Sequence, residues 1–372
     1  MRLETIAVHA GGEVDLETGA VAPPIHLSTT FEHGPAYEDL HGFSYIREKN
    51  PTQTRLEAAM QQLESGEAAL AFSSGMGAGA DVLQSLEPGS HVIFPDDIYV
   101  DYRNLSREYL AKWGIETSTV AMEKLDDLRA ALRPSTRLLW LETPSNPLLK
   151  ITDIQEVCKL AKEAGARVLV DNTFATPILQ RPLELGADIV LHSTTKYCGG
   201  HSDVQGGCLI LKNRDAFFDQ LLNTRRILGA VASPFASWLI LRGLRSLPVR
   251  MERHSANARA IAEALAANSK VEAVFYPGLK SHPGHEVAAR QMKDFGGMLS
   301  FLVKGGYDAA ITVASRLKLF LNATSLGGVE SLVEHRASSE GKGTRTPSNL
   351  LRVSVGLEHR DDLIEDLLQA LG

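Results

Sequence analysis

A lysine that follows a run of hydroxyl side chains is the first feature of this sequence that could do chemistry. In LHSTTKYCGG, residues 191–200, Ser193, Thr194 and Thr195 stand directly before Lys196. The preceding run, ADIVLHS, has the composition of a buried strand. Two interpretations are open. The lysine is either a surface residue of a solvated loop, because lysine is almost never fully buried, or a nucleophile beside hydroxyls that hold an anion.

A glycine-rich segment could bind a phosphate. FSSGMGAGADVL, residues 72–83, follows a β-rich run and opens a helical pattern, so its backbone N–H groups can hold an anion. The spacing Gly75-x-Gly77-x-x-Ala80, with Asp96 about 20 residues further on, also matches the permissive dinucleotide fingerprint of dehydrogenases. Tight packing of a helix on a strand is a third explanation of these glycines.

Two charged residues end or interrupt apolar runs. Asp171 ends the run VLVD, where a carboxylate is costly unless it pairs with a cation or a protonated nitrogen. Capping a helix is the alternative role for this aspartate. Arg352 lies within LLRVSV, and a buried arginine requires a bidentate carboxylate partner. An amino-acid substrate would supply that carboxylate, and so would an internal salt bridge.

Pyridoxal phosphate is a cofactor that uses all of these groups together. It needs an amine for its aldehyde, a carboxylate that keeps its pyridine nitrogen protonated, donors for its phosphate and an aromatic side chain over its ring. A dehydrogenase would leave the lysine without a role, and no histidine or cysteine spacing predicts a metal site. The residues that meet the four needs are Lys196, Asp171, Gly75 with Ser193 and Thr195, and Tyr99 of DDIYVDY.

Short β-rich runs alternate with helical patterns from about residue 55 to residue 212. This alternation predicts an α/β fold in which a largely parallel sheet carries helices on both faces. Ligands of such sheets bind beyond the carboxyl ends of the strands, which is where the polar clusters fall. The expected strands are AALAF, HVIFP, IETSTVA, RLLWLE, RVLVD, DIVLHS and GCLILK.

Three parts are predicted along the chain. Residues 1–40 show no sustained period and form an N-terminal arm that lies across another surface, such as another subunit. Residues 41–232 form the cofactor-binding α/β domain. A long helical stretch that starts near residue 233 and is kinked at Pro248 opens a smaller α+β domain, residues 233–372, with strands in VEAVFYP, GGMLSFLV and LLRVSV.

The composition excludes several classes of partner. The chain has 372 residues, 44% hydrophobic and 22% charged, with a net charge of −7. No basic cluster predicts a nucleic-acid or membrane-surface partner, and no apolar run is long enough to cross a bilayer. The beginning of the chain lacks the apolar core of a signal peptide. Three cysteines without a CxxC pair indicate neither disulfides nor a thiolate metal site, so we expect a reducing, cytoplasmic setting.

These motifs, in this order, resemble the cystathionine γ-synthase/γ-lyase family of trans-sulfuration enzymes. The resemblance extends over essentially the whole chain and implies fold type I of pyridoxal 5′-phosphate enzymes, with a large domain like that of aspartate aminotransferase. The motifs that carry it are PPIHLSTTF, YIREKNPT, SSGMGA, ETPSNP, VDNTFATP, HSTTKY with GGHSDVQGG, SLGGVESL and LRVSVGLE.

The resemblance implies a role for each matching residue. Lys196 would form the internal aldimine, Asp171 would pair with the pyridine nitrogen, and Tyr99 would stack on the ring and assist proton transfer. The cofactor phosphate would be bound by Gly75, Met76, Ser193 and Thr195, with Thr173 and Asn146 beside the cofactor. The substrate would meet Arg352 through its carboxylate, with Ser325 and Asn146 nearby.

The resemblance also implies an assembly. Tyr45 and Arg47 of YIREKNPT would reach the phosphate of a neighbouring subunit's cofactor, so that a homodimer shares its active sites. Two such dimers would form a homotetramer.

The reaction implied is γ-replacement or γ-elimination on a sulfur amino acid. A cystathionine β-lyase or another thiol-transferring member is the alternative, and an NAD(P)-dependent dehydrogenase is a more distant one. Three features depart from the family pattern: Thr324 in place of a glutamate before SLGG, a stretch after Tyr99 that is shorter by one residue, and EHRASSEGKGTRTP in residues 334–347. All three are expected near the substrate side chain, so the sequence does not separate synthase from lyase.

Overall fold

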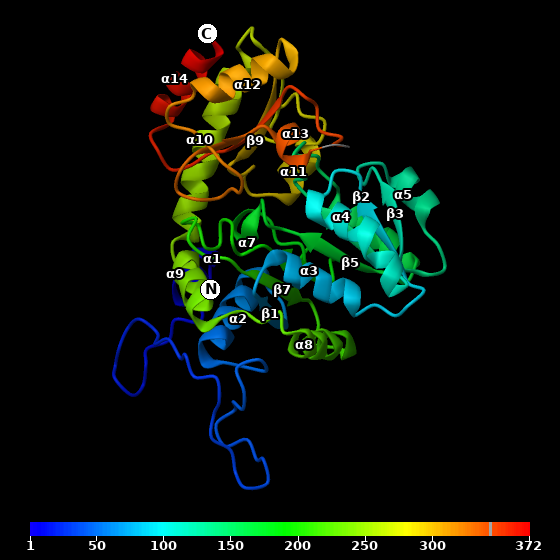
Figure 1. Ribbon diagram of the computed structural model, residues 1–372, viewed down its shortest axis with the longest axis vertical. Coiled ribbons are helices and arrows are strands. Elements are labelled where there is room, and N and C mark those ends of the chain that lie inside the picture. The colour runs from blue at the N-terminus through cyan, green and yellow to red at the C-terminus, as the bar shows by residue number, and fades with distance from the viewer. Residues whose placement is uncertain (342–343) are drawn as a thin grey trace.

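Two β-sheets organise the protein. The computed structural model describes residues 1–341 and 344–372. The larger sheet crosses the middle of the view in Figure 1, and the smaller sheet lies near the top. The larger sheet has the order β1-β7-β6-β5-β4-β2-β3. Its strands are β1 (Ala68–Phe72), β2 (His91–Pro95), β3 (Glu116–Val120), β4 (Thr136–Glu142), β5 (Arg167–Asp171), β6 (Ile189–His192) and β7 (Gly207–Leu211).

The larger sheet is mainly parallel, as the alternation of runs predicts. All pairings from β6 to β3 are parallel, whereas β7 runs antiparallel to both β6 and β1. The carboxyl ends of β4, β5 and β6 therefore meet at one edge. Each of the seven predicted runs coincides with one strand of this sheet, so the expected α/β fold is confirmed.

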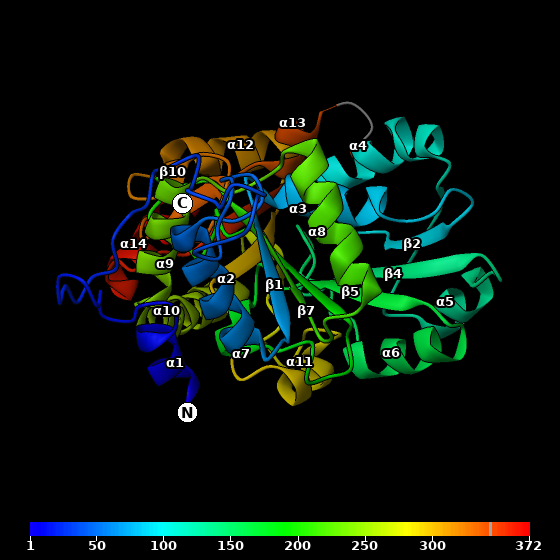
Figure 2. The same ribbon diagram turned by 90° about the horizontal axis from the view of Figure 1, so that it is seen from below.

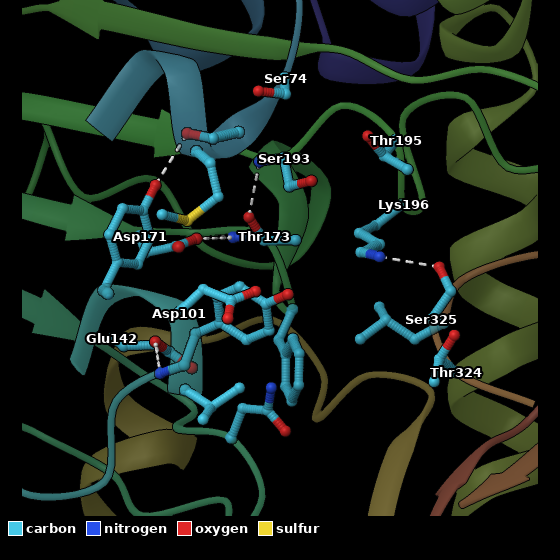
Figure 3. Close-up of a pocket in the computed structure, with 18 of the residues that line it drawn as sticks. Ser74, Asp101, Glu142, Asp171, Thr173, Ser193, Thr195, Lys196, Thr324 and Ser325 are labelled. Carbon is cyan, nitrogen blue, oxygen red and sulfur yellow. Dashed lines mark hydrogen bonds between the residues drawn. The ribbon is translucent and has the colours of Figure 1, made fainter. Parts of the chain in front are cut away.

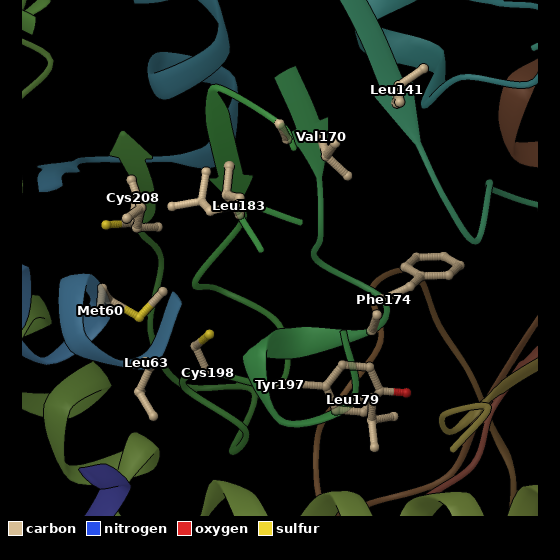
Figure 4. Packing of buried hydrophobic residues seen from close by; sticks show 14 of the residues in the cluster. Met60, Leu63, Leu141, Val170, Phe174, Leu179, Leu183, Tyr197, Cys198 and Cys208 are labelled. Atoms are coloured by element: carbon tan, nitrogen blue, oxygen red, sulfur yellow. The ribbon is translucent and has the colours of Figure 1, made fainter. Parts of the chain in front are cut away.

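Helices cover both faces of the larger sheet because its strands are apolar on both sides. Successive side chains of a strand point to opposite faces. In β4, Leu139 and Leu141 join one buried cluster and Leu138 and Trp140 join the other. Figure 4 shows residues of the first cluster, which extends from Met60 and Leu63 of one helix to Val170 and Leu141 of the sheet. The helices on that face are α2 (Pro51–Glu64), α6 (Ile154–Glu163), α7 (Thr176–Leu179) and α9 (Pro234–Leu244).

Three longer helices cover the opposite face, and two of them, α3 and α4, begin at the predicted site residues Gly75 and Tyr99. Figure 2 shows α3 and α4 along one side of the sheet, with α6 and α7 along the other. These helices on the second face are α3 (Gly75–Gln84), α4 (Val100–Glu108) and α8 (Ala216–Leu228), and two short helices, η1 (Leu110–Trp113) and α5 (Leu125–Ala131), lie near β3.

The smaller sheet is mixed and has its own apolar cluster, which includes Ile261, Val313 and Leu367. Its strand order is β10-β11-β12-β9-β8, with β12 at the centre. The strands are β8 (Val271–Phe275), β9 (Met298–Val303), β10 (Leu321–Asn322), β11 (Leu332–Glu334) and β12 (Leu350–Ser354). The helices of this part are α10 (Leu247–Ala266), α11 (His285–Gln291), α12 (Gly306–Arg316), α13 (Arg336–Glu340) and α14 (Arg360–Leu371).

Two features differ from the sequence predictions. Residues 233–266 form two helices rather than one kinked helix, and Pro248 lies in the first turn of α10, where its missing N–H costs nothing. The N-terminal arm begins with a helix, α1 (Leu3–His9), whose Leu3 and Ala7 are buried in the core. No helix in the described part of the chain has the length and apolar character needed to cross a membrane.

The rest of the arm extends away from the molecule. The segment between α1 and α2 contains no helix or strand among its described residues apart from isolated bridges such as Thr30 with Tyr45. Figure 1 shows it as long loops that leave the main body. Leu16 and Leu27 are 98% and 67% exposed. The boundaries placed at residues 40/41 and 232/233 stay predictions.

Candidate active site

One cavity of about 430 Å³ lies beyond the carboxyl ends of β4, β5 and β6 and faces the smaller sheet. Figure 3 shows the side chains that point into it from both sides. Every predicted site residue lines this cavity except Tyr45 and Arg47. Those that line it are Gly75, Met76, Tyr99, Asn146, Asp171, Thr173, Ser193, Thr195, Lys196, Ser325 and Arg352.

Lys196 is a partly buried amine rather than a surface lysine. It follows β6 in a turn in which its backbone N–H donates to Ser193 O at 3.1 Å. Its Nζ donates to Ser325 Oγ at 2.7 Å, a contact drawn in Figure 3. Burial, and next the positive charge of Arg352, lower the pKa of Lys196 to about 8. More of this amine is therefore neutral near pH 7 than in an ordinary lysine.

Ser325 adopts an unusual backbone conformation to make this contact. Its φ is 84°, in the left-handed region that favours glycine. Such conformations persist only where the surrounding structure holds them, and they cluster at functional sites. The strained serine thus holds the lysine amine from the side of the smaller sheet.

Asp171 forms a buried pair of carboxyl groups with Glu142. The two residues are direct partners in the register of β4 and β5. Asp171 Oδ1 accepts the backbone N–H of Thr173 at 3.0 Å, and the next helix, α7, has Ala175 at its N-cap, so Asp171 does not cap it. Burial raises the pKa of Asp171, and burial together with the Asp171 charge raises the pKa of Glu142.

The start of α3 and the turn after β6 form a cradle for an anion. Ser74 caps α3 by accepting the N–H of Gly77 at 2.9 Å, and Ser74, Gly75 and Met76 at this end of the helix line the cavity. A Cβ on Gly75 would lie 2.8 Å from Ser193 Cβ, so only glycine lets the two segments approach this closely. Ser193 N–H donates to Thr173 Oγ1 at 2.8 Å. The donor set suits a phosphate.

Tyr99 is fixed at the start of α4. Its backbone N–H donates to Glu142 Oε2 at 2.9 Å, which ties the helix to the end of β4. Burial, and next the neighbouring Asp101, raise the pKa of the Tyr99 phenol to about 12. The phenol is therefore neutral over the physiological range and can donate a proton.

Arg352 lines the cavity and also forms an internal salt bridge. It is 4% exposed in the central strand β12 and lines the cavity. Its Nη1 donates to Asn146 Oδ1 at 3.1 Å, and its Nη2 donates to Ser325 O at 2.9 Å. An internal salt bridge is also present, because Glu334 Oε2 lies 2.5 Å from Nη2.

Tyr45 and Arg47 lie outside the cavity. Arg47 Nη1 donates to the carbonyl of Arg226 at 3.1 Å, and its guanidinium lies 5.3 Å from the centroid of the Tyr45 ring. Tyr45 is 41% exposed. Within one chain these two residues are not brought to the other predicted site residues.

Several lining residues were not singled out from the sequence. Glu142 ends the run RLLWLE, so the same strand-end rule that finds Asp171 would have found it. Glu334, Arg336 and Ser339 come from the region that departs from the family pattern, and no motif signals them. Asp96, the ribose-binding candidate of the dehydrogenase interpretation, forms an ion pair with Lys150 Nζ at 2.8 Å and does not line this cavity.

A strand-end amine, a buried carboxylate and an anion cradle at the edge of a mainly parallel sheet define the class of pyridoxal phosphate-dependent enzymes of fold type I. The residues present fit the cofactor, because the cradle at Gly75 excludes a Cβ and provides phosphate donors within the same cavity as the amine. Residues 4–372 match the family described as Cys/Met metabolism PLP-dependent enzyme. The chain belongs to this family, as its motifs predict.

Relatives with different reactions resemble the chain to similar degrees. It is 48% identical to the cystathionine gamma-synthase of Mycobacterium tuberculosis, over 99% of this chain and 96% of that protein. It is 43% identical to the cystathionine gamma-lyase of Bacillus subtilis, over 100% and 99%, and 42% identical to the cystathionine beta-lyase of Coxiella burnetii, over 99% and 97%. The solved structure of metB from Corynebacterium glutamicum superposes with a TM-score of 0.97 at 44% identity, covering 100% of this chain and 98% of that one.

Proposed function

We propose that this chain catalyses γ-replacement or γ-elimination on a sulfur amino acid, as a cystathionine γ-synthase or γ-lyase does. One observation carries the proposal: the Lys196 amine, held 2.7 Å from Ser325 Oγ, lies in the same cavity as Asp171 and Arg352. The identity to the synthase of Mycobacterium tuberculosis supports this reaction class, and the identity to the beta-lyase keeps β-elimination as the alternative.

Residues at the edge of the larger sheet bind the cofactor, and Arg352 of the smaller sheet binds the substrate. Pyridoxal phosphate, when bound, supplies an electron sink for charge that develops at the substrate Cα. Asp171 holds a proton on the ring nitrogen of the cofactor, and the cradle of Gly75, Ser193 and Thr195 holds the phosphate. Lys196 Nζ takes and returns the proton of the substrate Cα. Arg352 binds the α-carboxylate of the substrate.

Tyr99 is proposed as the proton donor to the leaving group. A phenol with a pKa of about 12 is neutral at pH 7 and cannot act as the resting base. Its fixed position at the start of α4 keeps the phenol in the cavity. The proton transfer that the resemblance implies for Tyr99 is thus proposed to be donation by the phenol.

We further propose that two subunits complete each active site and that two such dimers form a tetramer. The segment between α1 and α2 holds Tyr45 and Arg47 outside the cavity of their own chain, which supports a role of these residues in the site of a neighbouring subunit. The cytoplasmic location expected from the cysteine content stays a prediction.

A substrate panel tests the proposed reaction. The holoenzyme is given cystathionine, methionine, homocysteine, or an O-acyl-homoserine with cysteine, and both the 2-oxo acid and any new thioether are measured. Thioether formation indicates synthase chemistry, and 2-oxobutyrate indicates γ-elimination. Pyruvate as the main product from cystathionine would replace the proposal with its β-lyase alternative. No turnover of any of these compounds by cofactor-loaded protein would refute both.

A further inference from the structure

We infer that Arg336 is a positioning residue for substrate binding: it holds Glu334 when the α-carboxylate of the substrate takes that residue's place on Arg352. The inference rests on the proposed role of Arg352 and deepens it. Arg336 lines the same cavity but is the first residue of α13, in the region that departs from the family pattern.

Arg336 belongs to a chain of alternating charges across the cavity wall. Glu334 contacts Arg352 on one side at 2.5 Å and Arg336 Nη1 on the other, with both carboxylate oxygens 3.2 Å from that nitrogen. Arg336 Nη2 continues the chain to Glu340 Oε1 at 3.1 Å, and Glu340 Oε2 lies 3.2 Å from Arg103 Nη2. Arg352 and Arg336 thus share a single carboxylate between them.

The charges of these five side chains leave one positive charge over. Glu334 neutralises one of its two arginines, and Glu340 is matched by Arg103 at the far end. Without Arg336, the Arg352–Glu334 pair would be neutral. A neutral buried pair attracts an incoming carboxylate weakly, because the attraction of its arginine is offset by repulsion from its glutamate.

Replacing Glu334 by a substrate carboxylate on Arg352 is energetically costly because the side chains involved are buried. The side chains of Arg352, Glu334 and Arg336 are 4%, 6% and 7% exposed. A buried charge left without a partner is strongly destabilising. If a substrate carboxylate takes Nη2 of Arg352, Glu334 must keep another cation close by. Arg336 meets this need because it already contacts both oxygens of Glu334.

The position of Arg336 is held from its other end. Glu340 accepts from Arg336 and Arg103 and also from Thr344 Oγ1 at 2.6 Å and Thr346 Oγ1 at 3.2 Å. The carboxylate is therefore fixed between α13 and α4. Because Arg336 is anchored at Glu340, it stays beside Glu334 while Arg352 changes partner.

Calorimetric binding of two small ligands to the holoenzyme tests the inference. L-Alanine carries the α-carboxylate but no leaving group, and ethylamine is the same skeleton without the carboxylate. Arg336→Met should raise the Kd for L-alanine about tenfold, within the range of coupling between neighbouring charged groups, and leave the Kd for ethylamine unchanged. Arg336→Lys should recover part of the loss, because it restores the charge but not both contacts.

The glutamate provides the matched control. Glu334→Gln removes the competitor for Arg352, so this variant should bind L-alanine at least as tightly as the wild type. In the Glu334→Gln background, Arg336→Met should have little further effect. Additive effects in this double-mutant cycle, or an equal loss for L-alanine and ethylamine, would mean that Arg336 only supports the fold of α13 and would overturn the inference.

A separate variant distinguishes failure of the inference from failure of the proposed function. Arg352→Met should weaken L-alanine more than Arg336→Met does and also spare ethylamine. If Arg352→Met leaves L-alanine binding unchanged, the assigned carboxylate site is wrong and the inference falls with it. If Arg352→Met weakens L-alanine and Arg336→Met does not, only the inference is overturned.

Discussion

The strand ends of the larger sheet and the segment between α1 and α2 carry predicted residues of the same site, yet they are built in different ways. At the strand ends, Lys196 and Asp171 follow short buried strands, and the backbone of one chain fixes them in a common cavity. Between α1 and α2, Tyr45 and Arg47 lie on a segment with exposed apolar side chains and do not reach that cavity. A single chain therefore brings together those predicted residues that its own hydrogen-bonded sheet positions.

The largest effect is expected from removing the amine of Lys196, at the end of β6. Lys196→Ala should abolish the visible absorption of bound cofactor and lower turnover by at least about 10³-fold, because no other amine in the described part of the cavity wall can replace it. Absorption spectra and steady-state assays measure both effects. Lys150→Ala is the matched control, since Lys150 is paired with Asp96 and Glu123 outside the cavity and should leave the spectrum unchanged. An active, coloured Lys196→Ala protein would end the proposal.

A smaller but still large effect is expected at the neighbouring strand end. Asp171→Asn keeps the shape of the side chain and its acceptor for the Thr173 N–H, but removes the charge that we propose holds a proton on the cofactor ring. Turnover should fall by about 10²–10³-fold, as for the loss of one preorganised electrostatic contact, while cofactor still binds through Lys196 and the cradle. Normal turnover by this variant would leave Asp171 with a purely local structural role.

The two regions also explain what the sequence could predict. The residues at strand ends can be predicted because apolar runs mark the strands, and the polar residue at the carboxyl end of a parallel strand lies at the ligand-binding edge. Glu142 was within reach of this rule although it was not singled out. The contacts of Arg336 were not predictable, because they join β11, β12, α13 and α4 through side chains far apart in sequence. Helix α1 escaped prediction because it is short and has only two buried positions.

The pH dependence of cofactor binding by the apoprotein reports the pKa of the Lys196 amine. An aldehyde reacts with the neutral amine, and the folded protein lowers the pKa of this amine to about 8. The rate at which apoprotein captures pyridoxal phosphate should therefore rise about tenfold per pH unit below pH 8 and level off above it. Stopped-flow absorbance measures the profile. Arg352→Met should move the break to higher pH, because the Arg352 charge contributes to the lowered pKa; a wild-type profile that still rises steeply above pH 10 would contradict the lowered pKa.

The smallest direct effect concerns Arg47 in the segment between α1 and α2, and it tests whether the site extends between subunits. Arg47→Ala should weaken cofactor retention by about tenfold, through the loss of one phosphate contact, although Arg47 does not line the cavity of its own chain. Equilibrium dialysis against pyridoxal phosphate measures the change. Arg55→Ala is the matched control, because Arg55 contacts Gly11 and Glu13 of its own arm and should retain cofactor normally.

Subunit mixing then tests the location of Arg47. In a two-fold dimer that shares its sites, a subunit with Arg47→Ala and one with Lys196→Ala leave one site with both groups intact. Random exchange of equal amounts should thus restore wild-type geometry to about a quarter of all sites, and activity should rise above the mean of the two parents. If both parents are folded, exchange is demonstrated and activity stays at that mean, Arg47 does not act across subunits. The segment between α1 and α2 would then contribute no residue to the site, and the cavity of a single chain would hold the complete site.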